Sequence, residues 1–183
     1  KPACILEKAP VFEEVGAGLQ LGPNAVHALQ WLGAWDAVAP HCVAPSEILL
    51  RDGISGNILQ RIPLGANFAK QFGAPYRLAH RADLQTALLE SVCSKPGIDL
   101  QSNAEATNVS IAETTLTVKS GTSFKGEAII AADGVHSAIR DLMTGQPRKN
   151  PIGHMLHRGL TPIASVPASV NIDVVTLWLF PGG

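Results

Sequence analysis

The residues that could contribute chemistry lie at the ends of predicted strands and helices. Glu7 closes the apolar run ACILE, Arg81 stands directly before a helical stretch, and Asp133-Gly134 joins an apolar run to another helical stretch. A carboxylate at a strand end can accept hydrogen bonds from the two hydroxyls of a ribose. A guanidinium can form two hydrogen bonds with a phosphate. These residue types are therefore compatible with a nucleotide ligand.

Each of these positions also has a structural explanation without a ligand. Glu7 could be a solvated acid that opens a loop, and Arg81 could be a surface arginine paired with Asp83 or another acid. The compact stretch Gly16-Ala17-Gly18 would let backbone N–H groups approach a flat or anionic ligand. Small loop residues are also common where no ligand binds, so the sequence leaves both interpretations open.

The stretch AIIAADGVHSAIRDLM, residues 128 to 143, predicts a buried strand, a tight turn and a helix. The N-terminus of a helix has free backbone N–H groups and a positive dipole end. Gly134 permits the turn, and Ser137 is placed to cap the helix. Asp133 would then bond a ribose hydroxyl or fix the turn through a main-chain amide. A capped turn with no ligand is the alternative.

Other kinds of catalytic or metal site have little support in the sequence. The chain has no Ser-His-Asp or metal-type spacing, and His154 and His157 form an HxxH with no cysteine or carboxylate cluster beside it, so no metal site is predicted. Cys4, Cys42 and Cys93 are far apart and form no CxxC pair. This pattern favours free thiols in a reducing cytoplasm, which is the predicted location.

The charge balance also limits the partners. Fourteen Lys and Arg oppose fifteen Asp and Glu, for a net charge of -1. No basic run suggests nucleic acid or anionic lipid. No uninterrupted apolar run approaches the roughly 20 residues that span a bilayer.

Hydrophobic periodicity predicts the elements that would position these residues. Apolar runs predict buried strands at 3–7 and 128–133, and Gly/Asn breaks within 46–80 predict a small antiparallel sheet. A helix over 23–35 would bury Val26, Leu29, Trp31 and Leu32, and a helix over 81–95 would bury Leu84, Leu88 and Val92. A hairpin within 98–121 and further strands within 154–166 and 173–180 complete the pattern. The fold class predicted is α/β, with a second sheet attached to the core.

Taken in order, three stretches resemble the FAD-dependent aromatic hydroxylases, the single-component flavoprotein monooxygenases of the salicylate and hydroxybenzoate hydroxylase type. They are LEKAPVFEEVGAGLQLGPNAVHALQWLG, HRADLQTALL and AADGVHSAIR, with HRGLTP at 157–162 as a weaker fourth. The resemblance covers nearly the whole chain. It implies a Rossmann-like, glutathione-reductase-like FAD-binding core with an attached, mostly antiparallel substrate-domain sheet.

The resemblance also implies roles for particular residues. Glu7 would hold the ribose of the FAD adenosine, with Lys8 beside it. Arg81, followed by Leu84, would reach the ribityl-pyrophosphate stretch of the cofactor. Asp133 and Gly134 would serve the pyrophosphate region, in a turn linked to nicotinamide cofactor use. The passage beside the flavin would be lined by Ala17, Gly18, Leu19 and Gln20.

In the family, a strand and a GxGxxG turn precede the matched segment and a Gly-Asp motif follows it, so we expect an internal piece that is incomplete at both ends. The expected FAD-binding part is 1–45 with 81–150. The expected substrate-binding sheet is 46–80 with 151–183.

The implied reaction is hydroxylation of a small aromatic, phenolic substrate with FAD, O2 and either NADH or NADPH. No residue in the chain is predicted to act as a catalytic nucleophile or base. One alternative is a non-catalytic remnant of the fold that does not hold FAD alone. Another is a different reaction of the same superfamily, such as epoxidation or a non-phenolic hydroxylation. Neither the ring position nor the oligomeric state is encoded in a recognisable motif.

Overall fold

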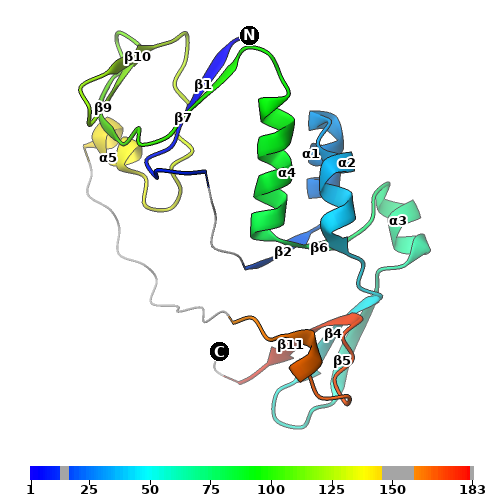
Figure 1. Cartoon of the computed structure of the whole chain (residues 1–183). Helices are drawn as coiled ribbons and strands as arrows, with labels where there is room; N and C mark the ends of the chain where they lie inside the picture. Colours follow the sequence, from blue (N-terminus) through cyan, green and yellow to red (C-terminus); the bar gives the residue numbers. More distant parts are fainter. Residues whose placement is uncertain (13–16, 146–158, 182–183) are drawn as a thin grey trace. The chain divides into compact units, whose positions relative to one another are not determined.

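The computed structural model describes residues 1–12, 17–145 and 159–181 (Figure 1). The chain divides into two compact units. The described part of the first unit comprises residues 1–12 and 95–145, and that of the second comprises 17–94 and 159–181. Both units combine strands with helices, and each has its own hydrophobic cluster, so the predicted α/β class is confirmed at this level.

A three-stranded antiparallel sheet in the second unit supports three helices. Its order is β2-β6-β3, with β2 at Gly18–Leu21, β6 at Arg77–His80 and β3 at Cys42–Val43. The helices α1 (Pro23–Leu32), α2 (Trp35–Val38) and α4 (Arg81–Cys93) lie beside one another over one face of this sheet (Figure 1). The short 3-10 helix η1 (Ala39–His41) connects α2 to β3.

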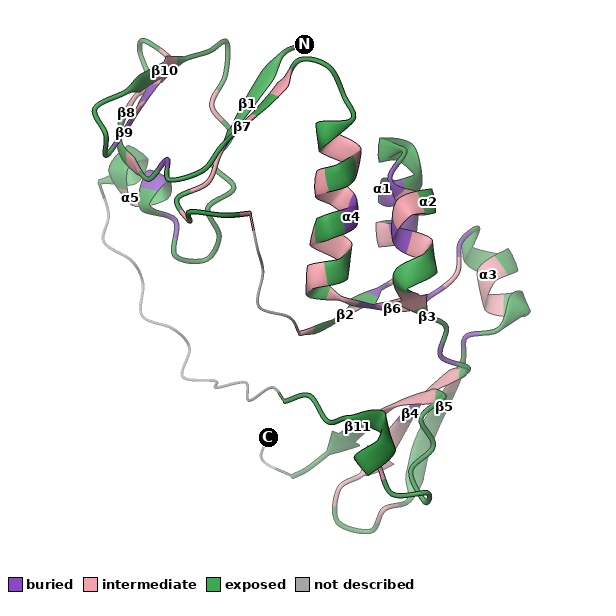
Figure 2. Ribbon diagram, viewed as in Figure 1, coloured by how far each residue is buried: buried purple, intermediate pink, exposed green. Residues whose placement is uncertain are grey.

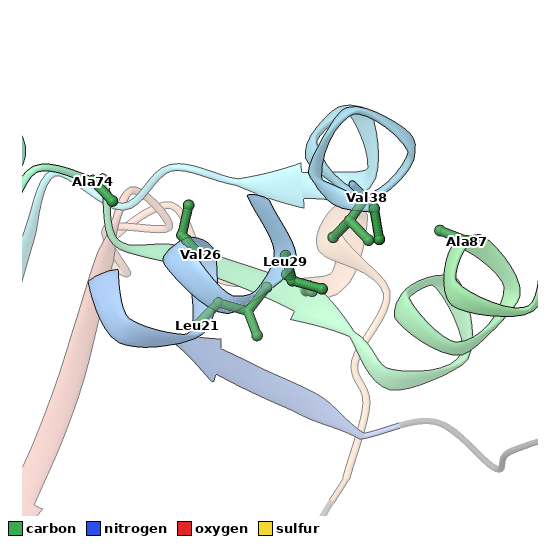
Figure 3. Close-up of a cluster of buried hydrophobic side chains, with 8 residues drawn as sticks. Leu21, Val26, Leu29, Val38, Ala74 and Ala87 are labelled. Carbon is green, nitrogen blue, oxygen red and sulfur yellow. The ribbon is translucent and has the colours of Figure 1, made fainter. Parts of the chain in front are cut away.

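The core between these helices and the sheet contains mostly small side chains. Val26, Leu29, Val38 and Ala87 come from the three helices and meet over the strands (Figure 3). The cluster is completed by the buried residues Leu21, Ala34, Ala74 and Ala79. Small residues at these positions allow α2 and α4 to approach closely. The layer is thin, so its stability depends on a few aliphatic side chains.

The predicted helix over 23–35 is divided in two. Gly33 adopts a φ of 70°, and its N–H donates to the carbonyl of Gln30, which ends α1. Leu29 is buried as predicted, but Trp31 is 86% exposed and Leu32 is 46% exposed, so the prediction was wrong for these two. Trp31 lies about 200° around the helix axis from Leu29 and therefore on the outer side. Leu32 lies in the last turn, at the edge of the cluster.

The predicted helix over 81–95 is confirmed as α4. Ala87 is buried, and Leu84 and Leu88 are half-buried against the same cluster. Val92, in the last turn, is half-buried.

A second sheet in this unit has the order β11-β4-β5, with bounds Val174–Leu179, Glu47–Asp52 and Ile58–Pro63. The β4–β5 hairpin confirms the antiparallel prediction, whereas β11 runs parallel to β4. The third predicted strand of the 46–80 sheet, YRLAH, is instead β6 of the other sheet, because Ala79 packs in the helical core. A helix that was not predicted, α3 (Ala66–Phe72), ends at Gly73, which has a φ of 73°.

The strand predicted within 154–166 is not formed in its described part. Residues 159–166 contain only the 3-10 helix η2 (Ile163–Ser165). Pro162 and Pro167 flank this turn, and proline has no N–H to donate to a sheet. Residues 154–158, which include His154 and His157, lie outside the described ranges.

The first unit is built from two small sheets and one helix. β1 (Ala3–Leu6) pairs in parallel with β7 (Ile98–Gln101). The predicted hairpin is confirmed by the antiparallel pair β8 (Ala106–Ser110) and β9 (Thr115–Val118), which β10 (Ser123–Lys125) extends. Helix α5 (Ala138–Thr144) packs on this hairpin, with Ile139 in a cluster with Ala104, Leu116 and Val118.

Two strands predicted to be buried are not buried in this unit. β1 is mostly exposed, with Ile5 at 40% (Figure 2). Residues 128–133 form no strand at all, and Ile130 is 88% exposed. An apolar strand needs hydrogen-bonded neighbours and a cover on each face. Among the described residues, β7 is the one strand that pairs with β1, and none pairs with 128–133.

Candidate functional site

Glu7 lies at the carboxyl end of β1 with its backbone held on both sides. Its N–H donates to the carbonyl of Gln101 at 2.8 Å, and its carbonyl accepts from the N–H of Ala104 at 2.8 Å. The side-chain Oε1 accepts from the N–H of Ala9 at 2.8 Å. No described residue donates a hydrogen bond to Oε2. The half-buried carboxylate is thus oriented by one oxygen while the other can accept from a ligand hydroxyl.

Lys8 follows directly and is exposed. It lies inside the turn that the Glu7–Ala9 hydrogen bond closes. Its ammonium group is close in sequence to the Glu7 carboxylate and adds positive charge at the same strand end.

Asp133 organises the start of α5 through both of its carboxylate oxygens. Oδ1 accepts from the Ser137 hydroxyl at 2.5 Å, and Oδ2 accepts from the N–H of Ile139 at 3.1 Å. Ser137 caps the helix as predicted, because its Oγ accepts from the N–H of Arg140 at 3.0 Å. Of the two roles considered for Asp133, the structure shows the hydrogen bond to a main-chain amide.

Gly134 allows the chain to turn between Asp133 and the cap. Its φ is 80°, a value that L side chains rarely adopt. Its carbonyl accepts from the N–H of Ser137 at 3.0 Å. A side chain at this position would strain the turn that aims Asp133 at the helix.

The hydrogen bonds at this turn set the ionisation of Asp133. Partial desolvation by itself would raise the pKa of this carboxyl. The hydrogen bonds from the Ser137 hydroxyl and from backbone N–H groups, including that of Ile139, outweigh it, so the pKa of Asp133 is lowered from its ordinary value. Asp133 is consequently a carboxylate at neutral pH.

In the second unit, Ala17 and Gly18 lie directly beside Arg81. The N–H of Arg81 donates to the carbonyl of Ala17 at 3.0 Å, and Gly18 pairs with His80 in the β2–β6 ladder. A Cβ on Gly18 would meet no atom within 4 Å. The backbone at the start of β2 is therefore open to close approach, and the exposed Arg81 leaves the sheet at the same point.

The remaining predicted residues of this unit lie on both faces of the sheet. Leu19 is half-buried and shares the helix-facing side with Leu21 and Ala79. Leu84 packs against the helical core. Gln20 is exposed on the opposite face, where its Oε1 accepts from the hydroxyl of Tyr76 at 2.6 Å.

The structure thus forms two groups, one in each unit. In the first unit, Leu6, next to Glu7, and Ile129, shortly before Asp133, pack against the same cluster. In the second unit, Ala17, Gly18 and Arg81 are brought together by one hydrogen bond and one strand pairing.

Tyr76 was not predicted as a site residue. It lies 56 positions from Gln20 in the sequence, so no local motif links the two residues. It is, however, the single tyrosine of the chain and directly precedes a strand that leads to Arg81. No described helix is long and apolar enough to cross a membrane, and the described residues contain no group of three potential metal ligands.

No family model matches the chain. Several curated proteins match it over almost its whole length, and two of them illustrate the match. It is 34% identical over 179 residues to a 3-hydroxybenzoate 6-hydroxylase of Polaromonas naphthalenivorans, which covers 97% of this chain and 44% of that protein. It is 37% identical over 181 residues to the 3-amino-4-hydroxybenzoate 2-monooxygenase PtnB3 of Streptomyces platensis. That match covers 98% of this chain and 45% of that protein. The chain spans under half the length of these relatives.

A solved structure adds a comparison of the fold. A variant of HpxO from Klebsiella pneumoniae, in complex with FAD, has a TM-score of 0.61 and 27% identity over 74% of this chain and 34% of that chain. The match in sequence extends through both units, and the match in fold includes most of the chain. On these findings the chain is similar, over almost its whole length, to part of the FAD-dependent aromatic hydroxylases.

Proposed function

We propose that this chain contributes part of a flavoprotein monooxygenase that hydroxylates a small aromatic substrate with FAD, NADH or NADPH, and O2. The observation that carries the proposal is the orientation of the Glu7 carboxylate. Its Oε1 accepts a hydrogen bond from the N–H of Ala9, and no described residue donates to its Oε2. A carboxylate held in this way can accept from paired ribose hydroxyls. The parallel pairing of β1 with β7 supports a Rossmann-like core around it.

Each of the two groups, taken by itself, has residues that suit a part of FAD. Glu7, with Lys8, would hold the adenosine ribose, and Asp133 and Gly134 would shape the turn near the pyrophosphate. In the other group, Arg81 would bind along the ribityl-pyrophosphate stretch. The open backbone at Gly18 would admit a flat ring, with Ala17, Leu19, Gln20 and Leu84 around it.

FAD, when bound, would supply the electron transfer and oxygen chemistry that side chains cannot provide. The chain would bind and orient it. Residues 1–45 and 81–150 would form the cofactor-binding part, and residues 46–80 and 151–183 the substrate-binding sheet.

The names of the two curated relatives suggest a substrate class. Both substrates are benzoates with a ring hydroxyl group. We propose the same kind of molecule for this protein, a small aromatic carboxylic acid that carries a hydroxyl.

The purified chain, incubated with FAD and desalted, tests the proposal. Retained visible flavin absorbance, together with NADH or NADPH oxidation that a hydroxybenzoate accelerates, would support the monooxygenase. A colourless protein that takes up no added FAD would support the alternative, a non-catalytic piece of the fold that does not hold FAD alone. That alternative follows from the share of the relatives that the chain spans.

Glu7→Gln should weaken FAD binding about tenfold, because the amide loses the charge that strengthens hydrogen bonds from ribose hydroxyls. The amide oxygen can still accept from Ala9, so the strand end should keep its conformation. Isothermal titration with FAD measures the change. Glu113→Gln, an exposed position in the β8–β9 turn, is the matched control. Equal FAD affinities for Glu7→Gln and wild type would remove Glu7 from the site.

A further inference from the structure

The face of the β2–β6–β3 sheet that points away from the helices has both polar and apolar side chains, with Leu78 of β6 opposite Gln20 and Val43 of β3 next to Leu78. Leu21 and Ala79 face the helical core, so the residues that alternate with them, among them Gly18 and Gln20 of β2, lie on the opposite face. Tyr76 reaches Gln20 from the residue before β6. It is 8% exposed, so its ring is fixed while Gln20 remains open to solvent.

The contact between Tyr76 and Gln20 has a defined direction. The two oxygens are 2.6 Å apart, a separation typical of an O–H donor and an oxygen acceptor and shorter than usual for an amide N–H donor. Tyr76 therefore donates and the side-chain carbonyl of Gln20 accepts. Burial raises the pKa of Tyr76, so the hydroxyl keeps its proton at neutral pH.

This bond fixes which way the Gln20 amide is oriented. An amide side chain has one acceptor oxygen and two N–H donors. Because Tyr76 fixes the oxygen, the orientation of the amide is set and its two N–H groups are available as donors on the open face, beside Gly18. A ligand with carbonyl oxygens matches these donors. The flavin of the proposed cofactor has such oxygens.

We propose that Tyr76 is a positioning residue that holds the Gln20 carbonyl, so that Gln20 presents its N–H groups as hydrogen-bond donors to FAD bound at the open face of this sheet. The inference rests on the proposed function and deepens it.

Three variants of the full chain, titrated with FAD, test this role. Tyr76→Phe removes only the hydroxyl and should weaken FAD binding about three- to tenfold, the range of one neutral hydrogen bond. Gln20→Glu keeps an acceptor for Tyr76 but replaces the donors with a carboxylate, so it should weaken FAD binding by more than about tenfold. In a Gln20→Ala background, Tyr76→Phe should add less than about a twofold change, because the two residues act together.

A second measurement tests the hydrogen bond between Tyr76 and Gln20 in the absence of any cofactor. Tyr76 is the only tyrosine, so ultraviolet absorbance during a pH titration follows its ionisation alone. Removal of the Gln20 acceptor should lower the midpoint of this titration. Gln60→Glu, which makes the same charge change at an exposed position of β5, is the control for FAD binding and should leave the affinity unchanged.

The outcomes separate the two proposals. If wild type and all the variants bind FAD with the same affinity, the role of Gln20 and Tyr76 is overturned and the proposed function remains intact. Variants that lose only hydroxybenzoate binding would overturn FAD as the ligand of Gln20. Identical tyrosine titrations in wild type and Gln20→Ala would overturn the hydrogen bond. Wild-type chain that takes up no FAD would overturn the proposed function together with this role.

Discussion

Replacing Leu29 by alanine should lower the free energy of unfolding of the second unit by about 3 kcal/mol, within the range measured for buried leucines. Leu29 is 7% exposed and points from α1 into the cluster that α2 and α4 complete (Figure 3). The neighbours Ala34, Ala79 and Ala87 are too short to fill the space that the side chain would leave. The lost contacts and the remaining cavity both contribute to the expected loss.

Tryptophan fluorescence during urea unfolding measures this effect selectively. All three tryptophans, at positions 31, 35 and 178, belong to the second unit, and Trp35 packs against the cluster itself. Leu32→Ala is the matched control, because it makes the same substitution one turn away at a position that is 46% exposed. We expect it to cost under about 1 kcal/mol. Similar losses for the two variants would contradict the assignment of Leu29 to the core.

Asp133→Ala should destabilise the first unit by about 2 kcal/mol, because it removes the acceptors of two hydrogen bonds at the start of α5. Ser137→Ala should have a similar cost, about 2 kcal/mol, since it also removes two hydrogen bonds, the one to Asp133 and the cap accepted from Arg140. The first unit contains no tryptophan, so fluorescence should be unchanged. Amide hydrogen exchange over residues 138–144 measures the loss.

The contribution of Asp133 should also depend on pH in one direction. The pKa of its carboxyl is lower in the folded chain than its ordinary value of 3.8. Its stabilising effect is therefore complete above about pH 4, the pKa region of an unfolded aspartate, and is lost as pH falls through the lower folded-state pKa. The protection of α5 amides, taken relative to their intrinsic exchange rate at each pH, should fall on acidification in wild type and much less in Asp133→Asn. The same acid response in both would show that another group is responsible.

The turn at Asp133 shows what a local pattern can predict. Aspartate, glycine and serine within five residues specify a turn followed by a capped helix, because their hydrogen bonds join residues at most six positions apart. The helix α4, the β4–β5 hairpin and the β8–β9 hairpin were predicted for the same reason. In each, the hydrophobic period and the turn residues lie within one short stretch.

The predictions that failed concern distant partners. The apolar period of residues 128–133 matches a buried strand, but burial depends on strands and side chains that no local pattern supplies. The pairing of YRLAH with β2 could not be predicted from a local pattern either, because β2 lies some 60 residues earlier in the chain.

By itself, the sequence determined the α/β class, the main helices and hairpins, the helix cap at Ser137 and the resemblance to the aromatic hydroxylases. Each depends on residue types at short spacings. Only the tertiary structure decided that Ala17 meets Arg81 and that Tyr76 holds Gln20. Such contacts depend on where strands pair and side chains point, and the free energy that selects them comes from packing across the whole unit.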